Sequence, residues 1–69
     1  MDAQEKAQAR VRIKRALREI PARVADQREI AWSHQRVGAM DAAHEALHTL
    51  WRIYEEHYHL TMALEDLSN

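Results

Sequence analysis

Apolar residues in the second half of the chain recur at steps of three and four, which is the period of an amphipathic helix. They fall into two neighbouring stripes that together cover about half of the helix circumference, more than the roughly 100° typical of a helix facing one core. This pattern predicts a helix over about residues 42–66. The first stripe contains Ala43, Ala46, Leu50, Ile53, His57, Leu60, Leu64 and Leu67, and the second contains Met40, Leu47, Trp51, Tyr54 and Tyr58.

The first half of the chain predicts a helix over about residues 2–36, with a narrower apolar stripe. Asp2 and Glu5 have the spacing of an N-cap residue and its capping-box partner. Pro21 removes a backbone donor and crowds the carbonyl group of Leu17, so we expect this helix to be kinked or broken there, and prefer a kink because Ile20 cannot act as an N-cap. The stripe consists of Ala9, Ile13, Ala16, Leu17, Ile20, Val24 and Ala31, and it leaves out Ile30, Trp32 and Val37.

Residues 37–41 between these segments predict a turn. Gly38 suits the left-handed position that ends a helix, and Asp41 suits the N-cap of the next one. The fold class is therefore all-α, a single domain over residues 1–69 built as a two-helix antiparallel hairpin.

The apolar face of the second helix is too wide for one narrow partner stripe to cover. We therefore expect the hairpin to dimerise into a helical bundle. His57 is expected to be a core histidine bonded across the bundle, with a pH-sensitive interface as the alternative. The residues assigned to the core or dimer interface are Leu47, Leu50, Trp51, Ile53, Tyr54, His57, Tyr58, Leu60 and Leu64.

Composition narrows the protein class further. The 69 residues include no Cys, one Gly and one Pro, which argues against disulfide scaffolds and turn-rich β folds. No apolar run approaches the length of about 18 residues that a membrane span needs. Because the first residues are polar, we expect no signal peptide. We expect a cytoplasmic protein without a cofactor, a membrane partner or a small-molecule substrate.

Charge is divided between the two halves. Residues 1–37 carry nine Lys or Arg and five acids, a balance of +4, whereas residues 38–69 carry one Arg and six acids, a balance of −5. Residues 10–18 form the densest basic cluster. This cluster fits a solvated or acid-paired face, a protein-binding surface, or a nucleic-acid contact. Acidic residues interrupt the basic half, so nucleic acid is not favoured.

Residues 44–48 match the H-E-x-x-H pattern of zinc proteases, in which two His one helical turn apart bind the metal. His44 and His48 are therefore weak candidates for metal ligands. The chain lacks the longer form of the motif, because Trp51 and Tyr54 occupy its Gly and third His positions. Ser33 and His34 are adjacent on a helix and point apart, so they cannot pair as nucleophile and base. We expect no enzymatic activity and no metal.

The exposed aromatic and basic side chains point to protein binding. Trp and Arg dominate the energetics of interfaces, and Arg12, Arg15, Arg18 and Trp32 are the residues assigned to a larger protein partner. The aromatic residues could instead serve the dimer. The sequence thus predicts a small non-enzymatic regulator or inhibitor that docks on a larger protein, with a nucleic-acid-associated regulator as the alternative.

In length, in its Cys-free two-helix pattern and in its aromatic and basic surface, the whole chain resembles small phage-encoded helical-hairpin proteins that bind and inhibit host regulators. Among these are anti-activators of quorum-sensing transcription factors. No motif matches, so no residue role is transferred. The resemblance implies an inhibitor whose partner is a transcription regulator.

Overall fold

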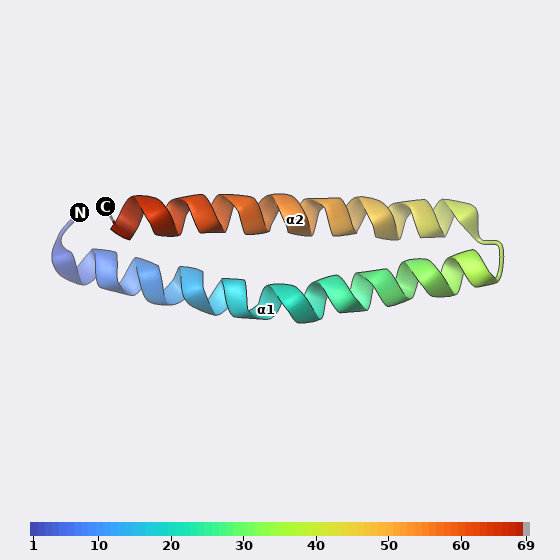
Figure 1. Ribbon diagram of the computed structural model, residues 1–69, viewed down its shortest axis with the longest axis horizontal. Coiled ribbons are helices and arrows are strands. Elements are labelled where there is room, and N and C mark those ends of the chain that lie inside the picture. The colour runs from blue at the N-terminus through green and yellow to red at the C-terminus, as the bar shows by residue number, and fades with distance from the viewer. Residues whose placement is uncertain (69) are drawn as a thin grey trace.

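The computed structural model describes residues 1–68 and consists of two antiparallel helices (Figure 1). Helix α1 spans Ala3–Arg36 and helix α2 spans Met40–Ser68. They pack along their full length in a rod that measures 52 × 15 × 12 Å, with both chain ends at the same end. The predicted all-helical hairpin is confirmed.

Helix α1 begins as the sequence predicts. The Oδ1 atom of Asp2 accepts a hydrogen bond of 2.8 Å from the backbone N–H of Glu5, which satisfies one of the unpaired donors at the helix start. The helix then continues through Pro21 to Arg36. A break of the helix at Pro21, one of the two expected outcomes, is therefore excluded.

The turn between the helices is a Schellman motif. The N–H of Ala39 donates to the carbonyl oxygen of His34, and the N–H of Gly38 donates to that of Gln35. Gly38 has a φ of 77°, the left-handed conformation predicted for it. Asp41 is not the N-cap, because α2 already begins at Met40. Its carboxylate lies in the first turn, where a negative charge interacts favourably with the positive end of the helix dipole.

The contact between the helices, here called the seam, is made mostly by small side chains. Among the described residues the buried apolar side chains are Ile20 and Ala31 of α1 and Ala43, Ala46 and Ile53 of α2. Three of these five are alanines, so the helices pack closely but bury little apolar area. Half-buried residues extend the seam, including Ile13, Leu17, Val24 and Gln27 on α1 and Leu50, Leu60, Leu64 and Leu67 on α2.

Two polar contacts between the helices show their register. An Nη1 atom of Arg10 donates to the carbonyl oxygen of Leu67 at 3.4 Å, and Arg23 forms an ion pair of 2.9 Å with Glu56. The hydrogen bond from Arg23 to Glu56 raises the pKa of this guanidinium above its ordinary value, because the carboxylate favours the charged form. The pair is partly exposed, so its contribution to stability is small.

Candidate protein-binding face

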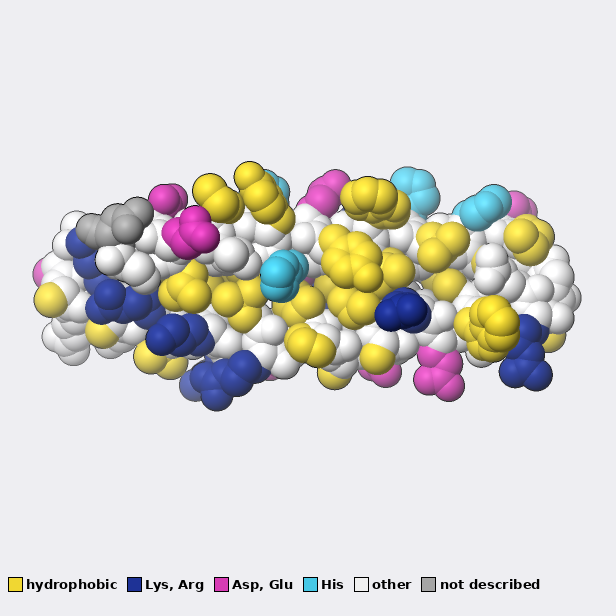
Figure 2. Space-filling model, in the orientation of Figure 1, with side chains coloured by type: hydrophobic (Ala, Val, Ile, Leu, Met, Phe, Trp, Pro, Cys, Tyr) yellow, Lys and Arg dark blue, Asp and Glu magenta, His cyan; other side chains and the backbone are white. Residues whose placement is uncertain are grey.

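The second apolar stripe of α2 remains open to solvent in the hairpin. Trp51 has 68% of its surface exposed, compared with 3% for Ile53 in the seam. Figure 2 shows hydrophobic side chains gathered along the middle of one face of the rod, over both helices. The exposed apolar residues of α2 are Met40, Leu47, Trp51, Tyr54, Tyr58 and Met62.

Helix geometry shows which side of the hairpin carries this stripe. Leu47, Trp51 and Tyr54 each come immediately after a seam residue. Along a right-handed helix, each successive side chain is rotated by about 100° about the helix axis, always in the same sense along the chain. Because α1 and α2 run in opposite directions and face each other, residues that follow the seam on either helix project to the same side of the hairpin.

Trp32 of α1 joins the stripe by this rule, because it follows the buried Ala31. It is 61% exposed. We call the seven residues together the aromatic face, and its members are Trp32, Met40, Leu47, Trp51, Tyr54, Tyr58 and Met62.

Basic residues of α1 lie on the same side. Lys14, Arg18 and Arg28 each follow a seam residue and are exposed, and Arg10 follows the half-buried Ala9. We call these four the basic rim. In Figure 2 dark blue side chains flank the hydrophobic band near the N-terminal end of α1. Glu65 follows Leu64 in the same way and places an acid on this side of α2.

The opposite side of the hairpin has a different character. It is made of the residues that precede the seam, and the ion pair of Arg23 with Glu56 shows that these positions meet there. Glu19, Asp26 and Glu45 lie on this side by the same rule, so acids and bases are mixed there. Ile30 of α1 is an exposed apolar residue on this opposite side, so it can serve as a control for substitutions in the aromatic face.

The residues that the sequence assigns to a larger partner do not form one cluster. Arg18 and Trp32 belong to the side with the aromatic face, but they are 14 residues apart, which is roughly 21 Å along a helix. Arg12 precedes the seam residue Ile13, and Arg15 points away from α2. All four are exposed. Arg12, Arg15 and Arg18 are spaced three residues apart, which is less than the 3.6 residues of one helical turn. Each arginine therefore points to a different side of α1.

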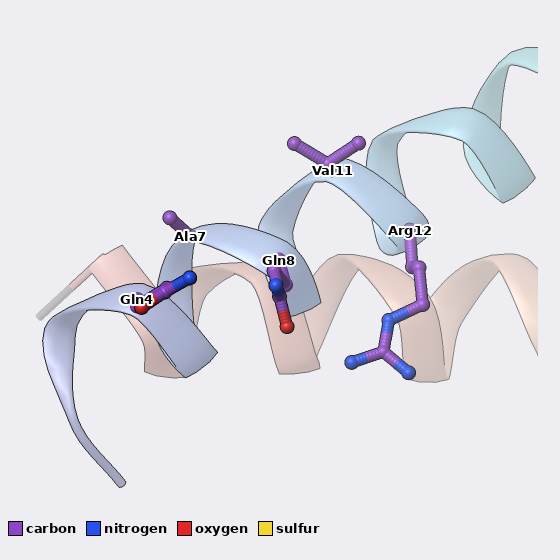
Figure 3. Close-up of a pocket in the computed structure, with 5 residues that line it drawn as sticks. All are labelled: Gln4, Ala7, Gln8, Val11 and Arg12. Carbon is purple, nitrogen blue, oxygen red and sulfur yellow. The ribbon is translucent and has the colours of Figure 1, made fainter.

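A shallow patch near the N-terminus of α1 includes Arg12. Figure 3 shows Gln4, Ala7, Gln8, Val11 and Arg12 along the surface of this single helix. All five are exposed, so the patch is an open helix surface. Val11 provides its apolar centre.

The residues proposed for the core and dimer interface divide into three groups in the single chain. Ile53 is buried, Leu50, Leu60 and Leu64 are half-buried, and Leu47, Trp51, Tyr54 and Tyr58 are exposed. His57 is also exposed in the single hairpin, although its spacing places it in the seam. Its neighbour Glu56 is half-buried instead, because it turns toward Arg23.

His44 and His48 lie exposed on the outer surface of α2, one turn apart, next to Glu45, Thr49 and Arg52. Within residues 1–68 no group of three or more His, Cys, Asp or Glu side chains is placed to hold a metal ion. A metal at this pair would need a ligand from another chain.

The size of the aromatic face can be judged from its four aromatic residues. They expose between 47% and 68% of their surface, and at about 150–250 Å² per residue this amounts to roughly 470 Å². The largest apolar patch of an ordinary monomer is about 300–600 Å². Leu47, Met40 and Met62 enlarge the face beyond this range, so it has the dimensions of a contact surface.

Comparison of the chain with protein-family models, curated proteins and solved structures finds no match. No helix within residues 1–68 combines the length and the apolar character needed to cross a membrane. Sequence reasoning missed Arg28 and Met62, and it named Arg10 and Lys14 only as members of the basic cluster at residues 10–18, without placing them beside the aromatic residues. Their position directly after a seam residue, or one turn beyond Tyr58 for Met62, is the signal that could have identified them.

Proposed function

We propose that this chain is a non-enzymatic protein-binding module whose hairpin binds other protein surfaces. The observation that carries the proposal is the aromatic face, exposed over both helices and edged by four basic residues. Aromatic anchors beside Arg are the composition in which binding energy concentrates at interfaces. The recognition mode is the docking of helix faces.

The module works as a homodimer, in which two hairpins form a four-helix bundle. A thin seam supports this, since a chain below about 70 residues rarely gains more than about 3–5 kcal/mol from its own core. We also propose that Pro21 bends α1, because its ring crowds the carbonyl group one turn earlier. The bend shapes the side of α1 that faces the second hairpin.

A larger protein partner, such as a transcription regulator, then docks on the outer side of α1. Arg12 and Arg15 lie outside the aromatic face and stay accessible when that face is covered. Val11 and Arg12 (Figure 3), together with Arg15 one turn after Val11, offer an apolar residue beside two positive charges. The complementary partner surface is apolar with an acidic edge.

Nucleic acid is the second candidate, favoured by one observation. Lys14, Arg18 and Arg28 share a side with exposed Trp and Tyr rings. Proteins that bind single strands combine cations that neutralise phosphates with aromatic rings on which bases stack. Glu65 on the same side and the mixed charges of the opposite side weigh against it.

The test is retention of proteins from a nuclease-treated lysate of the source organism on the immobilised chain. We expect one protein to be retained by the wild type and lost with Arg12→Glu plus Arg15→Glu. Arg52→Glu is the control, since this exposed arginine lies on α2. Circular dichroism must show equal helicity for all three chains.

A labelled single-stranded oligonucleotide, titrated at about 50 mM salt, separates the two candidates. The protein-binding proposal expects no salt-sensitive binding. Tight binding that falls steeply with salt concentration, together with no specifically retained protein, would replace it with the nucleic-acid function.

A further inference from the structure

We propose that the aromatic face is covered by a second copy of this chain, in an arrangement where α1 of each copy lies against α2 of the other. The two-fold axis then runs parallel to the long axis of the hairpin, and all four chain ends gather at one end of the bundle. This inference rests on the protein-binding function proposed above and names the first occupant of the face.

The register of the hairpin determines which residues meet across such a dimer. Arg10 bonds to Leu67 and Arg23 to Glu56, so each step forward along α1 is matched by a step backward along α2. Lys14 is therefore level with Leu64 and Glu65. A two-fold axis along the rod preserves these levels between copies, because it moves no residue along the rod.

Side-chain size is complementary in this arrangement. The side of α1 that faces the second copy carries small residues in its middle, Pro21 and Ala25, both exposed. Pro21 is level with His57 and Ala25 with Ile53. The large rings of Trp51, Tyr54 and Tyr58 lie at these levels on α2. The rings of one copy thus meet the small side chains of the other, as close packing requires.

Charge is complementary as well. Arg10, Lys14 and Arg18 of one copy face the C-terminal part of α2 of the other, where Glu65 lies on the contact side. The negative end of the α2 dipole adds to this attraction. A two-fold axis across the rod would instead set α1 against α1 and α2 against α2. Aromatic rings would then meet rings, and Lys14 would approach Arg28.

The exposed area of the hairpin matches the requirement of a dimer. Its accessible surface is 5484 Å², whereas a folded monomer of this mass exposes about 4500 Å². The difference is about 1000 Å², close to the roughly 800 Å² per partner that a standard interface buries. Covering the aromatic face would bring the chain to the ordinary surface of a folded protein.

Charge reversal tests the arrangement through mixing. Lys14→Glu alone and Glu65→Lys alone each create two like-charge pairs per dimer, and we expect each to weaken self-association about tenfold at low salt. An equimolar mixture of the two variants restores both opposite-charge pairs and should regain the wild-type dissociation constant in sedimentation equilibrium. Glu55→Lys is the control partner, because Glu55 is an exposed acid of α2 that points away from α1.

The double variant Lys14→Glu with Glu65→Lys in one chain should self-associate like the wild type. Circular dichroism of every chain shows whether the hairpin is intact. Wild-type protein that is monomeric at tens of micromolar, or a mixture that rescues no better than the Glu55→Lys control, overturns the inference. A monomeric wild type would also remove the homodimer from the proposed function. Binding of a larger partner would survive that result if the lysate experiment still retained one, and would fail only if nothing is retained.

Discussion

Replacing Trp51 by alanine is the sharpest perturbation of the aromatic face. In the single hairpin this side chain has 68% of its surface exposed and lies outside the seam, so the fold of one chain does not depend on it. If a second copy covers the ring, the burial of roughly 100–170 Å² is worth about 2.5–4 kcal/mol per chain. Two tryptophans per dimer double this amount.

The area estimate is an upper value, because association also costs side-chain and rigid-body freedom. We therefore expect Trp51→Ala to raise the dissociation constant of the dimer by at least about a hundredfold, which corresponds to about 2.7 kcal/mol. Sedimentation equilibrium measures the constant directly. Thermal unfolding followed by circular dichroism at several concentrations gives a second readout, because association stabilises the folded chain and makes its Tm rise with protein concentration.

Ile30→Ala is the matched control. Ile30 is a large apolar residue of which 43% is exposed, and it lies on the opposite side of the hairpin. This substitution should leave the dissociation constant within about threefold, as surface changes rarely exceed about 0.5 kcal/mol. A Trp51→Ala chain that still dimerises like the wild type, or an equal effect of Ile30→Ala, would refute the assignment of the face.

Three further changes test the hairpin itself. A Cβ atom added at Gly38 has no other atom within 4 Å, but the backbone φ of 77° at this position is strained for any residue other than Gly. Gly38→Ala should therefore destabilise the hairpin by about 1 kcal/mol and lower its Tm by roughly 4–8 °C. Pro21→Ala restores a backbone donor inside α1 and should keep or raise helicity and Tm; a loss of helicity would contradict this. His44→Ala with His48→Ala should leave the Tm unchanged with or without EDTA, and unfolding by EDTA would reveal a structural metal.

The sequence was sufficient for the elements of the fold. The apolar periodicity predicted both helices, and the residues at the boundaries, Asp2 and Gly38, take the conformations expected of them. The N-cap assigned to Asp41 was wrong, because the Schellman turn needs only the three residues 37–39 before α2 can begin. Short-range signals thus locate helix ends to within about two residues. Helix ends fray, so their boundaries are not defined more precisely than that.

The candidate face was only partly predictable. The spacing of Leu47, Trp51, Tyr54 and Tyr58 already separated them from the first stripe, and Trp32 stood apart from its own helix stripe. What the sequence could not provide is the relation between the two helices. To place Trp32 beside the α2 residues, and Arg12 away from them, one must know which face of each helix contacts the other helix. The burial of seam residues such as Ala31 and Ile53, together with the ion pair of Arg23 with Glu56, supplies that information.

The distribution of side-chain size between the two stripes bears directly on how the chain folds. A monomeric hairpin gains most if its largest apolar residues lie in the seam. Within residues 1–68, however, three of the five buried residues are alanines and no large side chain is completely buried. The alanines bring the helices close and leave the rings outside. Because burial of apolar area is the dominant favourable term in folding, much of it is available only when another surface covers those rings. If a second copy covers the rings as proposed, dimerisation adds to the stability of each hairpin, and the concentration dependence of the Tm measures that addition.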